Sequence, residues 1–297
     1  MREFKIKNLN NTQINILEGS NIEKPTAILI NVHGITSHFQ EVYYMEDSFR
    51  YRNNFFYNND IKLFGLEFHG HGKSDGVRCS INDFDDLVDD LYCLIKYINV
   101  NYDEKIPKFI IAESMGGAVA IKYNIKYQFE TNIRGYILLA PMCGIDENLK
   151  PHPFTISLLM FLSNYFPELP VLSTNSKMKK SCKNKKFLEL KDKNKFYYHG
   201  KLRLNTAREC YYTSLWINKY GHLFNAPLFL IHGKDDDITN PYLSIKFFNS
   251  VPNKSKKIFL PKNTNHALAL PIGDNDVKPK IIWIKILLWI KSQLDIQ

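Results

Sequence analysis

The chain has 297 residues, of which 44% are hydrophobic and 23% are charged. These values are ordinary for a soluble globular protein, so they exclude a mainly disordered chain, and the length suits one large domain or one domain with an insertion. The formal net charge of +9 is compatible with nucleic acid or an anionic membrane as a partner, or with no specific partner. We predict no nucleic-acid binding, because the sequence has no helix-turn-helix, zinc or aromatic–basic motif.

The cysteines and the apolar segments bear on the compartment. Cysteines stand at positions 79, 93, 143, 182 and 210 with no C-x-x-C pair, which favours reduced thiols over a disulfide framework or a zinc site. The N-terminal residues are polar and contain no apolar signal core. The longest apolar stretches, Phe154–Phe166 and Ile281–Ile290, fall short of the roughly 20 residues that span a bilayer. We expect a cytoplasmic protein that can also contact a membrane surface.

In the first half of the chain, strand and helix signals alternate. Segments Glu3–Lys7 and Gln13–Leu17 are expected to pair as antiparallel strands. Four short apolar runs that end at turn residues predict strands buried on both faces of a parallel sheet, at Ala27–Val32, Leu63–Phe68, Phe109–Ala112 and Tyr136–Ala140. Helical patterns lie between them at Val42–Phe56, Phe84–Ile98 and Gly117–Tyr127. This alternation predicts a mostly parallel central sheet flanked by helices, with right-handed crossovers.

The alternation stops after Pro141 and resumes near residue 226. The interval contains the apolar stretch 154–166, a Lys-dense stretch from Lys177 to Lys195 and a helical pattern at Thr206–Trp216. Two more strand patterns and two helical patterns then follow, at Pro227–Ile231, Tyr242–Asn249, Lys257–Leu260 and Lys278–Leu294. We therefore predict one α/β core, residues 1–142 and 226–297, split by an inserted subdomain, residues 143–225, called the insertion below.

A serine stands at the apex of a tight turn between a predicted strand and a predicted helix, in Ala112-Glu-Ser114-Met-Gly116. A nucleophilic serine on such a turn has strained backbone, so small residues must stand two positions before and after it. Ala112 and Gly116 meet that need, and we nominate Ser114 as the nucleophile; the alternative is a serine that only caps the helix. Ser74 has similar spacing in Gly72-Lys-Ser74-Asp-Gly76, but no small-residue helix follows it directly.

A reacting ester also needs hydrogen-bond donors for the negative charge that develops on its oxygen. The residue after the nucleophile, Met115, is expected to supply one backbone N–H. The turn after the first buried strand, His33-Gly34-Ile35, is expected to supply the other, and we nominate the Ile35 N–H. The alternative is that this His-Gly pair forms an ordinary turn.

A serine nucleophile is activated by a histidine base that a carboxylate orients, and in strand–serine–helix hydrolases the chain order is serine, acid, histidine. Downstream of Ser114, a buried strand ends in an acidic turn with Asp235, Asp236 and Asp237. We choose Asp236 as the acid and keep its two neighbours as alternatives. Of the nine histidines, only His266 follows both Ser114 and this turn and also follows a strand, so we nominate it as the base.

These segments resemble the monoacylglycerol lipase and lysophospholipase branch of the α/β-hydrolase superfamily. The resemblance rests on His33-Gly34, Gly70-His-Gly-Lys-Ser-Asp-Gly76 followed by Asp83-Phe84, Glu113-Ser-Met-Gly-Gly117, Leu139-Ala-Pro-Met-Cys143, His232-Gly-Lys-Asp-Asp236 and His266. It implies the α/β-hydrolase fold, a triad of Ser114, Asp236 and His266, no metal or organic cofactor, and an insertion that forms a cap over the acyl site. Its H-G-x-x-D pattern is what favours Asp236 over the neighbouring acids.

We therefore predict a serine hydrolase that cleaves the carboxylic ester of a monoacylglycerol or lysophospholipid through an acyl-enzyme. The alternatives are a broad-specificity carboxylesterase, a thioesterase, or a lipid-binding protein without catalysis on the same scaffold. Ser114 argues against epoxide hydrolase and dehalogenase chemistry, which would need a carboxylate at its position. The expected substrate-binding residues are His33, Gly34, Glu113, Phe154, Leu158 and Leu159. The insertion is also a candidate for contact with anionic membranes; the alternative is a packed helix beside a solvated loop.

Overall fold

The computed structural model describes residues 2–38, 55–127, 130, 132–144, 152–173, 185–268 and 277–295. Most of the helix predicted at Val42–Phe56 and the start of the Lys-dense stretch, residues 177–184, lie outside these ranges. In the described part, no helix is long and apolar enough to cross a bilayer. The cysteines that fall in the same part are free thiols, as predicted.

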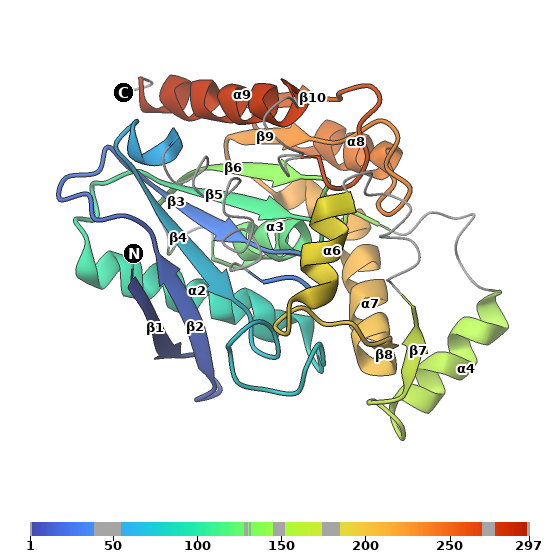
Figure 1. Ribbon diagram of the computed structural model, residues 1–297. Coiled ribbons are helices and arrows are strands. Elements are labelled where there is room, and N and C mark those ends of the chain that lie inside the picture. Colours follow the sequence, from blue (N-terminus) through green and yellow to red (C-terminus); the bar gives the residue numbers. More distant parts are fainter. Residues whose placement is uncertain are drawn as a thin grey trace.

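In the described ranges, eight strands form the central sheet, which is drawn in Figure 1. They are β1 (Arg2–Lys7), β2 (Gln13–Glu18), β3 (Ala27–Val32), β4 (Ile61–Glu67), β5 (Lys108–Glu113), β6 (Ile133–Leu139), β9 (Leu228–Ile231) and β10 (Lys256–Phe259). Their order across the sheet is β1-β2-β4-β3-β5-β6-β9-β10. Strand β1 pairs with β2, and β2 with β4, in antiparallel fashion, and the remaining pairs are parallel. The mostly parallel sheet and its antiparallel start are therefore confirmed.

The sheet is buried on both faces because its strands are apolar on both sides. In β3, Ile28, Ile30 and Val32 enter one hydrophobic cluster, whereas Ala27 and Leu29 enter a second cluster on the opposite face. Successive side chains of a strand point to opposite faces, so only a continuous apolar run can fill two cores. Each fully buried aliphatic side chain contributes roughly 1.5–3 kcal/mol.

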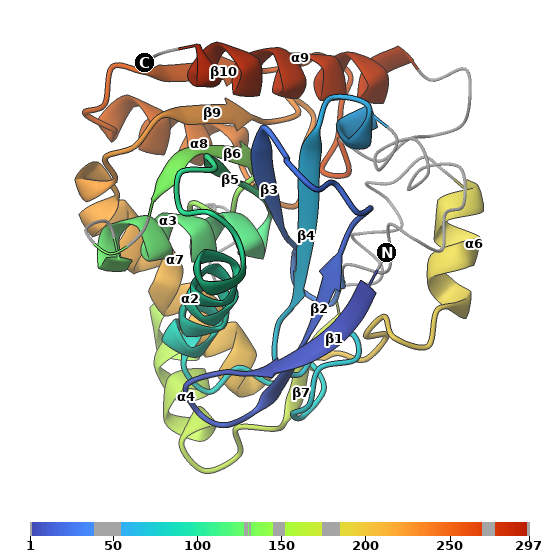
Figure 2. The ribbon, with the colours of Figure 1, turned by 90° about the vertical axis from the view of Figure 1, so that its left-hand side faces the viewer.

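Helices cover both faces of the sheet (Figure 2). Helices α2 (Phe84–Asn101), α3 (Met115–Tyr127) and α8 (Pro241–Ser250) pack on the first cluster, and α9 (Val277–Leu294) packs on the second. The apolar face of α9 follows from Ile282, Ile286 and Ile290, which are spaced four residues apart and are buried. At the start of α2, the Asp83 carboxylate accepts a hydrogen bond from the Asp85 N–H, a standard helix cap.

The insertion lies between β6 and β9 and contains α4 (Pro153–Ser163), β7 (Pro170–Leu172), α6 (Lys185–Lys193), β8 (Leu202–Arg203), α7 (Leu204–Tyr220) and a short 3₁₀ helix (Gly221–Leu223). Its two strands pair with each other and not with the central sheet. Thr206 at the start of α7 attaches the insertion to the core: its hydroxyl donates to Cys79 O (2.8 Å) and accepts from Ile81 N (3.1 Å). Helix α4 lies at the periphery in both views.

The parallel strands bring five turns to one edge of the sheet. In the ladder, Val32 pairs with Ala112, Glu113 with Leu139, and Leu139 with Ile231, which in turn pairs with Phe259. The residues that follow these strand ends are therefore neighbours in space although they are far apart in sequence. In open parallel sheets, ligands bind at this carboxyl edge.

Candidate active site

Ser114 occupies the turn between β5 and α3 with a φ of 55°, in the left-handed region. The surrounding backbone holds it there, because its N–H donates to Leu139 O (3.0 Å) and its carbonyl accepts from Met142 N (2.9 Å). A non-glycine residue in this region is strained and persists only where the surroundings impose it. The strained turn expected at this serine is thus present.

Gly116 shows why the turn needs a small residue after the serine. A β-carbon at Gly116 would lie 2.6 Å from His33 O and 2.7 Å from Val32 O, closer than atoms can approach. The start of α3 therefore packs directly on the end of β3. Gly34, in the turn that follows β3, is close enough to Ser114 that a β-carbon there would lie 3.7 Å from the Ser114 Oγ.

Ser74, the other serine with similar spacing, is buried and its hydroxyl is occupied. It donates to Glu67 O and accepts from Asn15 N at 2.8 Å, which ties the loop after β4 to β2. A hydroxyl committed to two backbone groups is not available as a nucleophile. This contact gives Ser74 a structural role.

The structure separates the three candidate acids. Asp236 is buried, whereas Asp235 and Asp237 are exposed. The Asp236 Oδ2 lies 2.8 Å from His266 Nδ1, and the Oδ1 accepts the backbone N–H groups of Ile238 (2.8 Å) and Thr239 (3.1 Å). The carboxylate is thereby fixed against the His266 ring, which is the arrangement that orients a histidine base.

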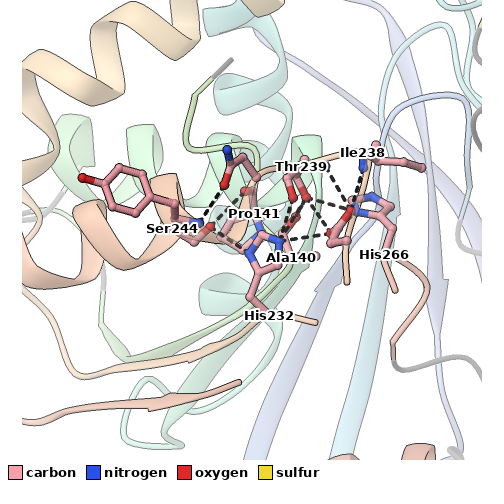
Figure 3. A network of polar contacts seen from close by, with 10 residues as sticks. Ala140, Pro141, His232, Ile238, Thr239, Ser244 and His266 are labelled. Carbon is pink, nitrogen blue, oxygen red and sulfur yellow. Dashed lines mark hydrogen bonds and ion pairs between the residues drawn. The ribbon is translucent and has the colours of Figure 1, made fainter. Parts of the chain in front are cut away.

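A second histidine contacts the same carboxylate. His232, which is fully buried at the end of β9, places its Nε2 3.0 Å from Asp236 Oδ2 and 3.0 Å from Thr239 O. Its Nδ1 lies 2.9 Å from the Ser244 Oγ on α8. Figure 3 shows Thr239 between the rings of His232 and His266. Sequence reasoning used His232 only as the first residue of the H-G-x-x-D pattern that favoured Asp236 and gave its ring no role; its position four residues before Asp236 was the signal that could have marked it as a partner.

Thr239 also joins this cluster to the turn beside Ser114. Its hydroxyl lies 2.9 Å from Asp236 Oδ2, 3.1 Å from His266 Nδ1 and 3.2 Å from Ala140 O (Figure 3). Ala140 follows Leu139, the residue that accepts the Ser114 N–H. Within the described residues, no hydrogen bond joins the Ser114 Oγ to His266. Such contacts are often long in a resting site and tighten when substrate binds.

The charges around His266 favour its protonated form. Burial lowers the pKa of His266, but the hydrogen bond and charge of Asp236 outweigh it, and the charges of Glu113 and Asp237 add to them, so the pKa is raised above its ordinary value. Burial raises the pKa of Asp236, but the hydrogen bonds of His232 and His266 hold it well below its usual range. Asp236 therefore stays ionised and stabilises an imidazolium at His266.

Two backbone N–H groups adjoin Ser114 or the glycine that packs on it, those of Met115 and Ile35. Among the described residues, neither the Ile35 N–H nor the Met115 N–H forms a hydrogen bond. Ile35 adjoins Gly34, which packs on Ser114, and Met115 follows Ser114 directly. Their positions suit a pair of donors for an oxyanion.

The expected substrate-binding residues are not all brought together. The His33 ring is a structural support: its Nδ1 donates to Gly34 O (2.7 Å) and its Nε2 accepts the Phe68 N–H (3.2 Å). Burial lowers the pKa of His33 to about 3, so the ring is neutral. Phe154 and Leu158 on peripheral α4 are 72% and 46% exposed, and neighbouring Leu159 is half-buried, so the structure does not place them in a closed acyl tunnel beside Ser114. Their role in substrate binding stays a prediction, because apolar composition does not determine which surface a helix contacts.

In the described ranges, no three His, Cys, Asp or Glu side chains are grouped as a metal site would require.

Comparisons with known proteins bear on the family and the fold of this chain. A family model described as serine aminopeptidase, S33, matches residues 23–270. A caffeoylshikimate esterase from Arabidopsis thaliana is 27% identical over 236 residues, covering 78% of this chain and 69% of that protein. A monoacylglycerol lipase from Mycolicibacterium smegmatis is 20% identical over 270 residues, covering 91% of this chain and 90% of that protein. The crystal structure of a soluble variant of monoglyceride lipase from Saccharomyces cerevisiae, in complex with a substrate analog, matches with a TM-score of 0.78 and 16% identity, over 97% of this chain and 94% of that one. The predicted α/β-hydrolase fold is confirmed.

Proposed function

We propose that this chain, which belongs to the serine aminopeptidase S33 family and is a serine ester hydrolase, cleaves the carboxylic ester of a monoacylglycerol or a lysophospholipid. The observation that carries the proposal is the buried Asp236–His266 pair, 2.8 Å apart, at the sheet edge where Ser114 stands on a strained turn. A carboxylate, an imidazole and a hydroxyl in this chain order are the groups that acyl transfer to serine needs.

In the proposed reaction, His266 takes the proton of the Ser114 hydroxyl as its oxygen attacks the ester carbonyl. Asp236 stabilises the imidazolium, and the N–H groups of Ile35 and Met115 donate to the oxyanion of the tetrahedral intermediate. When the ester C–O bond breaks, His266 gives its proton to the departing alcohol. A water molecule then attacks the acyl-enzyme by the same route and releases the fatty acid and the free serine.

Two observations support a lipid ester as the substrate. Relatives of this chain include proteins named monoacylglycerol lipase, monoglyceride lipase and phospholipase. The insertion also exposes large apolar side chains along α4 and the segment after it, at Phe154, Leu158, Phe161, Tyr165, Phe166, Leu169 and Leu172. We call this set the α4 surface. An apolar surface of this extent suits contact with acyl chains or with a membrane from which the lipid is taken.

A fluorophosphonate probe tests the nucleophile. Ser114→Ala should abolish labelling and turnover while the thermal unfolding midpoint stays close to wild type. Ser74→Ala is the matched control and should keep both. Labelling that persists in Ser114→Ala would refute the nucleophile, and an unlabelled wild-type protein that still binds lipid would favour the non-catalytic alternative.

The substrate class needs a separate comparison. We expect kcat/KM for a 2-acyl-glycerol or for lysophosphatidylcholine to exceed that for a short soluble ester, an acyl thioester or a hydroxycinnamoyl ester. A preference for the hydroxycinnamoyl ester would instead align the chain with its relative named caffeoylshikimate esterase. Equal rates on all of them would indicate a broad carboxylesterase.

A further inference from the structure

The turn that carries the Ile35 N–H contains a strained residue of its own. Thr36 has a φ of 65°, although it is β-branched, and it is 1% exposed. A β-branched residue in the left-handed region is an outlier that only its surroundings can hold in place. The contacts that hold Thr36 therefore also determine the direction of the backbone next to it.

Thr36 is held by the core, where its backbone hydrogen-bonds with the Cys79 side chain, and by the insertion. The Thr36 hydroxyl donates to the Tyr197 hydroxyl oxygen at 2.8 Å, and the Tyr198 N–H donates to Thr36 O at 3.1 Å. Two residues further along the turn, the His38 Nε2 lies 2.9 Å from the Asn194 Nδ2. Tyr197 is 5% exposed, so its hydroxyl bond is shielded from water. One short segment of the insertion after α6, residues 194–198, is thus hydrogen-bonded to the turn that follows β3.

The other end of the turn is held by the core. His33 donates to its neighbouring carbonyl and accepts the Phe68 N–H, and Gly34 packs on Ser114. Ile35 lies between these two anchors. If Thr36 relaxed out of the left-handed region, the adjoining peptides would turn with it, and the Ile35 N–H would change direction.

We propose that Tyr197 is a positioning residue for the oxyanion donor: its hydroxyl holds Thr36 in the left-handed conformation and thereby aims the Ile35 N–H at the reacting oxygen. The inference rests on the proposed function. It makes the insertion part of the apparatus that stabilises the tetrahedral intermediate, in addition to any role in binding the acyl chain.

Tyr197→Phe removes one oxygen atom and tests the proposal. Loss of a whole oxyanion donor costs about 10²–10³-fold in kcat, so misdirection of one donor should cost roughly tenfold on a short soluble ester, with KM within about twofold of wild type. Binding of a trifluoromethyl ketone, which forms a tetrahedral oxyanion adduct with the serine, should weaken by the same factor as kcat/KM. Tyr212→Phe, an exposed tyrosine on α7 of the same insertion, is the control and should behave as wild type.

Two further variants separate positioning from a general packing defect. Thr36→Val removes the other half of the contact, so its loss should match that of Tyr197→Phe and the two losses should not add in the double variant. Thr36→Gly adopts positive φ without help, so combining it with Tyr197→Phe should restore kcat.

The proposal would be overturned if kcat of Tyr197→Phe equalled that of Tyr212→Phe. It would also be overturned if the losses of kcat in Tyr197→Phe and Thr36→Val added in the double variant, or if Thr36→Gly did not restore the kcat of Tyr197→Phe. Failure of the proposed function is distinct, because it would appear in the wild-type protein as absent Ser114-dependent labelling.

Discussion

Two strongly apolar segments of this chain differ sharply in their burial. Strand β5 is buried along its length up to Glu113, where it delivers Ser114 to the sheet edge. Helix α4 is similarly apolar in composition, but Ser163 is its one buried residue within the range that the structure describes. The strand is enclosed because neighbouring strands and helices cover it, whereas α4 contacts the protein along one side only. Apolar residues of the core thus enclose the site, whereas those of α4 are largely exposed to solvent.

The largest expected effect concerns the buried site at the edge of the core sheet. Asp236→Asn keeps the shape of the side chain but removes the charge that stabilises the His266 imidazolium. We expect kcat to fall by about 10⁴-fold, as in other Ser-His-Asp sites. Steady-state kinetics on a short soluble ester measures this loss. Asp235→Asn, at an exposed neighbour, is the control, and a large loss there instead would reassign the acid.

The next largest effect concerns the exposed apolar surface of α4. Phe154→Ser combined with Leu158→Ser removes two apolar side chains from the α4 surface. The transfer free energy to a lipid phase should become less favourable by on the order of 2 kcal/mol, so partition into lipid vesicles should fall roughly thirtyfold. Vesicle sedimentation measures this partition, and kcat on a soluble ester should not change. Leu288→Ser, on the exposed side of α9, is the control. Equal partition of both variants and wild type would remove the case for membrane contact through α4.

The second histidine on Asp236 tests how far the rigid site extends. His232→Phe replaces the imidazole by an aromatic ring without nitrogen and so removes a hydrogen-bond donor to the Asp236 carboxylate. It should lower the free energy of unfolding by about 1–3 kcal/mol and kcat by roughly tenfold. Ser244→Ala removes the contact to the His232 Nδ1 and a long hydrogen bond to Pro141 O but leaves the His232 contact to Asp236 in place, so both quantities should change much less. Denaturant unfolding and steady-state kinetics measure the two. If kcat were unaltered in His232→Phe, His232 would contribute to packing and not to catalysis.

The smallest expected effect is a shift in pH dependence. His266 must be neutral to accept a proton, and its pKa is raised, so activity should be lost as the pH falls through a value above the ordinary histidine pKa of about 6.5. Asp237→Asn removes one of the charges that raise this pKa and should move the acidic limb of kcat/KM to lower pH. Asp235→Asn should leave the limb in place, since Asp235 is not among the main groups that raise the pKa of His266. An acidic limb below about pH 6 in wild type would contradict the base assignment.

Much of the core could be predicted from the sequence because its determinants are local. Apolar runs that are long enough to fill two faces predicted the strands to within two residues at Ala27–Val32 and Phe109–Ala112. The small residues around Ser114 predicted the strained turn, since they are needed wherever a helix starts that close to a strand. The chain order of serine, acid and histidine nominated three residues that the parallel sheet then brings to one edge.

Other features depended on contacts between distant parts of the chain. The sequence by itself determined the mostly parallel fold, the candidate nucleophile and the choice of His266. Periodicity and turn chemistry depend on neighbouring residues, and the order of residues can be read directly along the chain. Only the tertiary structure decided that Asp236 is buried while its neighbours are exposed, that His232 joins it, and that Phe154 and Leu158 face outward. It also placed Tyr197 on Thr36 across 161 positions of sequence. No local pattern encodes such a contact, since it exists only once the insertion has packed against the carboxyl edge of the sheet.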